Sequence, residues 1–332
     1  MTLSNETEAR SAARDKARRA LQHLDLTSGR GLELGALDRP LVRRSGADVG
    51  YVDLTDTEGL RAHYADDPNV RGEDLVEVDF TLLHDGQTRT LAEATNGSGT
   101  YAWVVASHVI EHVPDLIGFL ADVAEVLVDG GRLALVVPDS RYSFDALRQP
   151  TTVGEILLAH HQSDQRPSLR AVFDHFTDAV NLTAAALWEG AQPTADDHLH
   201  SPEMAWDNAF RWQAGEYIDC HAWLFTPTIL VDQLRQLADQ GLSDFTVAAI
   251  SPTKTYEAEF FATLQRVPRD LGDRARVDLL ALGFHPIVDS PDPPATAQPD
   301  GEYQIVVSER EMKVIEAKRR LGTFLRQRVP RR

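Results

Sequence analysis

The stretch Tyr101–Asp139 constrains the fold of this chain more than any other. Its first part, Ala102–Ala106, is a short apolar run with polar neighbours, which is typical of a buried strand. Apolar residues then recur at helical spacing from Pro114 onward, and Asp129-Gly130-Gly131 ends that segment. A second apolar run, Arg132–Val137, follows at once. Strand, helix, glycine turn and strand form a βαβ unit, which predicts a parallel sheet with a right-handed crossover.

The connection Ser107–His112 is rich in groups that bind ligands. Ligands of parallel sheets bind beyond the carboxyl ends of the strands, so we expect this connection to form a wall of a site. His108-x-x-Glu111-His112 also matches the H-x-x-E-H pattern of a zinc peptidase family. That chemistry needs the pattern inside a long helix, whereas Pro114 starts the helix just after it here. We therefore disfavour a peptidase, and a polar loop that only satisfies a helix N-terminus is the plainer alternative.

Three short apolar runs that carry acids precede this unit. They are Gly31–Gly35 with Glu33, Val49–Asp53 with Asp53, and Leu75–Phe80 with Asp79. Asp53 follows Gly35 by about 20 residues, a spacing that in nucleotide-binding βαβ folds puts a carboxylate on the ribose hydroxyls. Three such runs in series predict a site for a nucleotide-like cofactor.

This arrangement resembles the class I S-adenosylmethionine-dependent methyltransferase family, of the type with an E-H-x-x-D stretch (here Glu111–Asp115) after its fourth strand. The resemblance implies an α/β fold with a Rossmann-like, seven-stranded, mostly parallel sheet and S-adenosyl-L-methionine as the cofactor. It implies contacts from Glu33, Gly35 and Ala36 in the first loop, Asp53 and Leu54 at the ribose, Asp79 and Phe80 at the adenine, and Ser107 and His108 under the methionine.

One departure concerns the first loop, which in the family usually reads G-x-G-x-G. Here Ala36-Leu37-Asp38-Arg39 follows Gly35. Without further glycines the backbone cannot follow the usual path along the whole loop. We expect another path, with Asp38 or Arg39 contacting the cofactor; weakened cofactor binding is the alternative.

The chain of 332 residues divides around this core. Residues 141–225 interrupt the family plan and are too many for a structureless connection, so we expect a mainly helical substrate cap. The core is expected over 28–140 and 226–308, with an insertion at 253–300 and a seventh strand at Tyr303–Val307. An N-terminal helix over 1–27 precedes it, and a basic C-terminal helix over 309–332 follows it. The N-terminal helix either packs on the domain or covers the nucleotide site.

The cap holds half of the twelve histidines. They are His160, His161, His175, His198, His200 and His221. Histidine titrates near neutral pH and can act as a general base, and mixtures of acids and imidazoles can also bind a divalent metal. A polar cap whose histidines bond backbone groups is the plain alternative. For a hydroxyl acceptor we rank His175 and His221 first as the base, with His112 as the alternative from the sheet.

These observations predict a methyltransferase that acts on a polar small molecule. We expect O- or N-methylation, by in-line displacement, of a sugar, a glycoconjugate intermediate or a related metabolite. The alternative is a non-catalytic methyltransferase-like binding or regulatory module, which the missing glycines would favour. A nicotinamide dehydrogenase would need G-x-G-x-x-G, and Gly35–Pro40 does not supply it.

Expectations about metals and partners are mostly negative. We expect no metal and assign no ligand to one, although His108–His112 resembles the E-x-x-E-H stretch that holds a divalent ion in ubiquinone O-methyltransferases, with histidine in place of the first glutamate. The net charge of −18 argues against a nucleic-acid partner, and no apolar run is long enough for a membrane span. A single cysteine, Cys220, and the lack of a secretion signal favour the cytoplasm. The sequence leaves open whether the protein forms a homo-oligomer.

Overall fold

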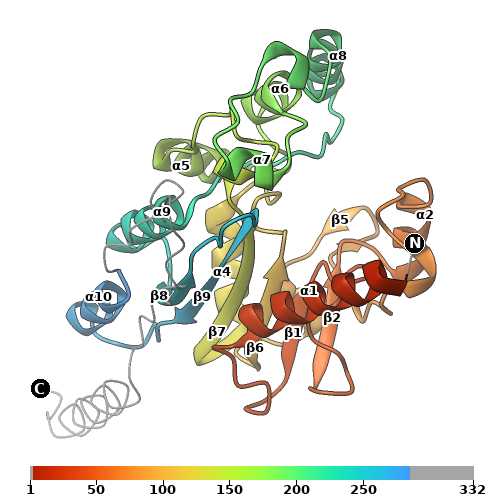
Figure 1. Ribbon diagram of the computed structural model, residues 1–332. Coiled ribbons are helices and arrows are strands. Elements are labelled where there is room, and N and C mark those ends of the chain that lie inside the picture. The colour runs from red at the N-terminus through yellow and green to blue at the C-terminus, as the bar shows by residue number, and fades with distance from the viewer. Residues whose placement is uncertain (1–2, 285–332) are drawn as a thin grey trace, which may run out of the picture.

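A seven-stranded sheet stands at the centre of the protein in the computed structural model, which describes residues 3–284 (Figure 1). The strand order is β3-β2-β1-β6-β7-β9-β8. The strands are β1 (Gly31–Leu34), β2 (Val49–Asp53), β3 (Phe80–Thr81), β6 (Tyr101–Ser107), β7 (Leu127–Pro138), β8 (Phe245–Ser251) and β9 (Glu259–Arg266). Strand β9 runs antiparallel to both β7 and β8, and the other pairings are parallel. The expected Rossmann-like, mostly parallel α/β fold is confirmed.

Helices cover both faces of the sheet. Helix α1 (Leu3–Leu21) lies across β7 and β9 on one face. The other face carries α3 (Leu91–Thr95), α4 (Leu116–Val126) and α9 (Pro227–Asp239), and α10 (Asp273–Leu282) packs beside α9. Near the β3 edge lie α2 (Thr57–His63), the 3-10 turn Gly72–Asp74 and the small hairpin of β4 (Leu83–His84) and β5 (Gln87–Thr88). No helix within residues 3–284 is long and apolar enough to cross a membrane.

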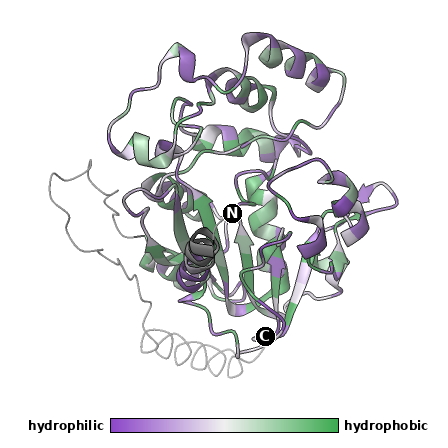
Figure 2. Ribbon diagram, turned by 45° about the vertical axis from the view of Figure 1, so that its right-hand side comes forward, coloured by the Kyte–Doolittle hydropathy of each residue, from purple (hydrophilic) through white to green (hydrophobic). Residues whose placement is uncertain are grey.

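Side chains of β6 and β7 alternate between two hydrophobic cores. Val104, Leu133 and Leu135 belong to the larger core, with α4 and α9. Trp103 and Val105 belong to the smaller core on the opposite face. Because both faces are covered, these strands are apolar at nearly every position, as Figure 2 shows for the central strands. The sequence therefore located the apolar runs of both strands, but α4 ends at Val126 and β7 begins at Leu127, so Asp129-Gly130-Gly131 lies within β7 and does not form the expected turn.

The third strand differs from its expected position. We expected it over Leu75–Phe80, but β3 begins only at Phe80 and pairs with Val52 and Asp53. The backbone before it bonds to other groups: the Val76 N–H donates to the Leu37 carbonyl at 2.9 Å, and the Val78 N–H to the Thr57 hydroxyl at 2.9 Å. These bonds hold the segment in a loop.

The region after α9 also differs. We expected residues 253–300 to be an insertion. They contain β9, which lies between β7 and β8 in the sheet and runs antiparallel to both. Phe260, Ala262 and Leu264 face the larger core while Phe261 faces the opposite side, so β9 is buried on both faces. The strand expected at Tyr303–Val307 and the basic helix expected over 309–332 lie outside the described residues.

Residues 141–225 contain mostly helices, which stand beyond one end of the sheet in Figure 1. They are α5 (Val153–Gln162), α6 (Leu169–Asp178), α7 (Ala184–Trp188) and α8 (Pro202–Gln213), with 3-10 turns at Ser140–Tyr142 and Ala195–Asp197. The segment touches the connection after β6: the Ala222 N–H donates to the Glu111 carbonyl at 2.7 Å, and His160 Nδ1 lies 2.9 Å from an Asp115 oxygen. We call residues 141–225 the cap.

Two glycine substitutions test the packing of the sheet. A Cβ on Gly31 in β1 would lie 2.1 Å from the Trp103 ring, which is 1% exposed, so Gly31→Ala should destabilise the fold by about 1–3 kcal/mol or more through overpacking. Gly154 in α5 is exposed, so Gly154→Ala should be neutral or stabilising by up to about 1 kcal/mol. Urea denaturation measures the change in the free energy of unfolding of each variant. The change should be a loss for Gly31→Ala but not for Gly154→Ala, and equal changes in the two variants would contradict this.

Candidate functional site

Three neighbouring strands end level with one another. Leu34 of β1 pairs with Val52 of β2 and with Ala106 of β6, so the next residues in line are Gly35, Asp53 and Ser107. A cleft of about 2070 Å³ opens beside this edge. Gly35, Ser107 and His108 line it from the strand ends, α1 lines it from one side, and His221 of the cap lines it from another. The cleft is where the sequence predicted a cofactor.

Two residues of the first loop have left-handed backbone conformations, although only one of them is glycine. Gly35 has φ +64° and Leu37 has φ 45°, so the second glycine position of G-x-G-x-G is a left-handed leucine. That conformation costs a leucine roughly 1–2 kcal/mol. The bond from Val76 N–H to the Leu37 carbonyl helps to hold it. The Asp38 carboxylate accepts from the Arg71 N–H at 3.3 Å, while Arg39 lies on the cleft.

Glu33 fixes this loop from below. It is 1% exposed, and its two oxygens accept the backbone N–H groups of Leu41 and Val42 at 2.7 and 2.9 Å. Burial raises the pKa of Glu33 to about 7, against the effect of these two bonds. Ala36, at the turn between them, is buried as well. Glu33 therefore shapes the loop that borders the cleft.

Asp53 offers a carboxylate at the end of β2. One oxygen accepts the Leu54 N–H at 2.7 Å, and no basic side chain in residues 3–284 forms an ion pair with it. Burial raises the pKa of this carboxyl above its usual value. Leu54 beside it is 54% exposed. A ribose diol could donate to Asp53, and Gly35 lets the backbone approach closely, so the residues present fit an S-adenosyl-L-methionine cofactor.

Asp79 and Phe80 do not join this group, which corrects the expected adenine contact. Asp79 lies before β3, and its carboxylate accepts from the Tyr51 N–H at 2.7 Å and from Arg44 at 2.6 Å. Phe80 packs against the larger core, over Gly50. Thr81, not Asp79, pairs with Asp53 at the strand end. The later start of β3 is the reason, because it leaves Asp79 two residues short of the edge.

His108 connects three elements at the cleft. It has φ 54°, and its Nε2 lies 2.8 Å from a Glu259 oxygen of β9, which also accepts from Lys16 of α1 at 2.8 Å. Its Nδ1 lies 3.4 Å from Glu111. Burial alone would lower the pKa of His108, but the two glutamates outweigh it and raise the pKa to about 9. For Glu259 the effects are reversed: burial would raise its pKa, but His108 and Lys16 lower it to about 2. A charged His108 thus joins α1, β6 and β9.

His112 and His221 face each other beside this network. Their ring centroids are 4.9 Å apart at a near-perpendicular angle. His112 Nδ1 lies 3.0 Å from Asp219, and His221 Nδ1 lies 2.6 Å from Asp145. We call these two histidines and their two aspartates the histidine centre. On each ring the Nδ1 is occupied by a carboxylate, which leaves the Nε2 for chemistry.

Buried charges hold the histidine centre in place. Asp145 is 1% exposed and also bonds Arg148 at 2.6 Å. Burial would raise the pKa of Asp145, but the bond from His221 and the Arg148 charge outweigh it and hold the pKa below its usual value. Burial would lower the pKa of His112, but Asp219 raises it overall. Arg148 also donates to the backbone carbonyl of His221 at 2.9 Å, so it helps to orient both Asp145 and His221.

His175 is not part of this centre, which corrects its ranking as a base. Its ring packs on Phe144 and Phe176 in the cap, and its Nδ1 is buried with no hydrogen-bond partner among the described residues. Burial lowers its pKa to about 4, so it is neutral at pH 7 and accepts a proton poorly. Phe144 lies between it and His221, contacting both rings.

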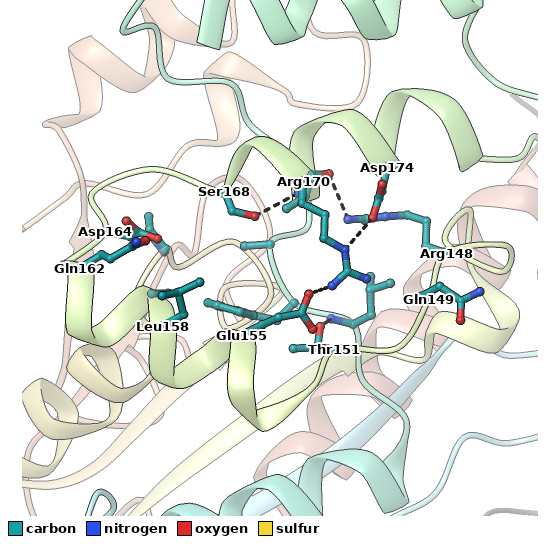
Figure 3. Close-up of a pocket in the computed structure, with 16 residues that line it drawn as sticks. Arg148, Gln149, Thr151, Glu155, Leu158, Gln162, Asp164, Ser168, Arg170 and Asp174 are labelled. Carbon is teal, nitrogen blue, oxygen red and sulfur yellow. Dashed lines mark hydrogen bonds and ion pairs between the residues drawn. The ribbon is translucent and has the colours of Figure 1, made fainter. Parts of the chain in front are cut away.

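A second, smaller cavity of about 170 Å³ lies inside the cap, between α5 and α6 (Figure 3). Arg170 extends between Glu155 and Asp174 there and pairs with both. Arg148, on the cavity wall, is committed to Asp145. Because these charges neutralise one another, we interpret this cavity as a packing feature of the cap.

Several residues of the site gave no local signal in the sequence. Asp145 lies 76 residues from His221, and Glu259 lies 151 residues from His108. Lys16 and Glu259 are 243 residues apart. Asp219, by contrast, lies only two residues before His221 in the sequence. Pairs this distant in sequence become visible only when the sheet order is known.

The fold is that of a methyltransferase. The family described as "Methyltransferase domain" matches residues 6–181, more than half of the chain, and the chain belongs to that family. It is an S-adenosyl-L-methionine-dependent methyltransferase. A search of curated proteins finds no match.

Solved structures with similar folds include two S-adenosylmethionine-dependent methyltransferases. That from Listeria monocytogenes is 12% identical, with a TM-score of 0.38 over 78% of this chain and 100% of the other. That from Mesorhizobium loti is 15% identical, with a TM-score of 0.39 over 76% and 98%. The CurJ carbon methyltransferase is 14% identical, with a TM-score of 0.32 over 75% of this chain, and this chain covers only 51% of it. None of these similarities bears on the substrate.

Glu33 gives the protein a specific pH dependence. Its folded pKa of about 7 lies above the ordinary 4.5, so between these values the folded state keeps a proton that the unfolded state releases. Its contribution to stability therefore falls as pH rises from about 4.5 to 7, by up to about 3 kcal/mol, and is constant above that. The free energy of unfolding of wild type relative to Glu33→Gln, measured at pH 5 and pH 8, should decrease accordingly. A pH-independent difference would contradict this.

Asp53 and Asp79 can be separated by S-adenosylhomocysteine binding. Asp53→Ala should weaken binding by about 1–3 kcal/mol, the range for hydrogen bonds to a charged group. Asp79→Ala should cost about 1 kcal/mol of stability, because it loses the Tyr51 and Arg44 contacts, and leave the affinity nearly unchanged. Isothermal calorimetry measures both, and a loss of affinity in Asp79→Ala alone would reverse the assignment.

Proposed function

We propose that this methyltransferase transfers a methyl group to an oxygen or nitrogen of a polar small molecule. The observation that carries the proposal is the histidine centre, in which each Nδ1 meets a carboxylate and His221 also lines the cofactor cleft. A neutral amine needs little help from such a centre, whereas a hydroxyl must lose its proton as the methyl group arrives. The proposal therefore favours a hydroxyl.

The cofactor would lie across the strand ends. Asp53 would bind its ribose, the Gly35–Leu37 turn would follow its methionine part, and Ser107 with His108 would lie below the sulfonium. S-adenosyl-L-methionine supplies an activated methyl group when bound. The chain's own task is then to align the acceptor and remove a proton. The new bond to the acceptor forms as the sulfur–carbon bond breaks, and the proton leaves through the centre to water.

Helix α1 supports a closed arrangement during this step. Lys16 bonds Glu259 and Arg19 bonds Glu257, so two polar contacts fix α1 along the cleft, and Gln22, just after the helix, bonds Ser251 at 2.9 Å. Excluding water strengthens the interactions inside the site. This favours α1 as a cover of the cofactor site over simple packing.

A polar acceptor agrees with the lining of the cleft. Arg39, Arg43 and Ser143 line it together with the apolar rings of Tyr142 and Phe144. Charged and hydroxyl groups beside flat aromatic surfaces suit hydroxyl-rich ligands. We therefore propose a sugar, a glycoconjugate intermediate or a related metabolite as the acceptor.

Substitution of the histidines tests the proposal. A screen of sugars, nucleotide sugars and amino acids with labelled methyl donor identifies an acceptor. With it, His112→Ala and His221→Ala should each lower kcat by about 10²–10⁴-fold and keep S-adenosylhomocysteine affinity, because both act after cofactor binding. His175→Ala, as the matched control, should retain near-normal kcat. Near-normal turnover in the first two variants would overturn the role of the centre.

A further inference from the structure

We propose that Glu111, His112 and His221 bind a divalent transition-metal ion. One donor atom from each residue lies within 4.8 Å of the other two. This extends the proposed function, on which its catalytic meaning rests, by naming the group that activates the acceptor. It also revises the expectation that the protein needs no metal.

Glu111 provides the strongest indication. It is 0% exposed, and neither carboxylate oxygen has a hydrogen-bond partner among the described residues. The nearest cation is His108 at 3.4 Å, and the other nitrogen of that ring is engaged by Glu259. Buried carboxyl groups in folded proteins almost always have polar partners, so a group with neither oxygen hydrogen-bonded points to a ligand that binds more closely than His108 does.

The hydrogen bonds of His112 and His221 suit a role as metal ligands. With Nδ1 of each ring held by Asp219 or Asp145, the Nε2 atoms are left with a lone pair for a metal. Histidine ligands in metal sites commonly donate their other ring N–H to a carboxylate, which fixes ring orientation and raises ligand basicity. Here both histidines have that partner.

The backbone explains why the third ligand comes from the cap. The Glu111 carbonyl accepts the N–H groups of Ala222 at 2.7 Å and Trp223 at 3.2 Å, which holds the neighbouring His221 against Glu111. The ligand set thus differs from the His108-x-x-Glu111-His112 pattern in the sequence. His108 is turned toward Glu259 and Lys16, and His221 takes its place.

The donor set indicates the class of metal. Two imidazoles and one carboxylate suit Zn²⁺, Fe²⁺, Co²⁺ or Mn²⁺ better than Mg²⁺, which prefers oxygen ligands. Metal–ligand distances of about 2.0–2.2 Å place donors about 2.8–3.6 Å from one another, so donors up to 4.8 Å apart would have to approach by as much as about 1.2–2 Å. Three protein ligands leave positions open for the acceptor's hydroxyl. As a Lewis acid the ion would lower the pKa of that hydroxyl, and the proton would leave to water.

Metal binding can be measured without any acceptor. The tag-free, full-length protein is stripped with a chelator and titrated with Co²⁺, following the visible absorption of the bound ion, and then with Zn²⁺ in competition. Wild type should bind one equivalent. Glu111→Gln and His221→Ala should each weaken binding by at least about 100-fold, and Asp145→Asn, which weakens the contacts with His221 and Arg148 but removes no ligand, by about 10–100-fold. His175→Ala, a histidine of the same cap outside the set, should bind as wild type does.

Circular dichroism of each variant checks that it is folded, and His112→Gln provides a second ligand variant of different shape. No stoichiometric Co²⁺ binding by wild type, or equal affinity in a folded Glu111→Gln, would overturn the metal site. If the stripped enzyme methylates its acceptor at full rate and still needs His221, the site is a metal-free base: this inference fails and the proposed function stands. If Co²⁺ binds as expected but no oxygen or nitrogen acceptor is methylated, the proposed function fails and the metal site stands.

Discussion

The backbone carbonyl of Glu111 is the contact on which the arrangement of the site depends. It accepts two N–H groups from the end of the cap, while the Glu111 side chain is buried at the end of β6. One residue thereby joins the central parallel strand to a segment more than 100 positions later in the chain. His112 and His221 meet because their neighbours are joined in this way.

The acidic side chains around that contact are held in place by their hydrogen bonds and ion pairs. Three acids around the site have specific partners: Glu33 accepts two backbone N–H groups, Asp145 pairs with Arg148 and His221, and Glu259 pairs with Lys16 and His108. Glu111 alone among these four has no hydrogen bond to its carboxylate. The same reasoning that explains the stability of the site therefore singles out the position where a ligand would matter most.

Much of the cofactor edge could be predicted because it depends on local patterns. Apolar runs such as Ala102–Ala106 mark strands buried on both faces, and the residue after such a run lies at the sheet edge. Gly35, Asp53 and Ser107 were located by this rule and do lie level. The rule failed for Asp79, because Thr57 and Leu37 bond the backbone before β3 and delay the strand. It also missed β9, whose first residue is an acid that pairs with α1.

The sequence by itself determined the family, the mostly parallel sheet and the sheet edge proposed for the cofactor, because hydrophobic periodicity and strand-end residues are short-range signals. Only the tertiary structure decided which histidines lie together. His175 and His221 look alike in sequence, yet one is enclosed by Phe144 and Phe176 and the other bonds Asp145 beside the cleft. The difference arises from contacts between residues far apart in the chain, which depend on how the cap folds back onto the sheet.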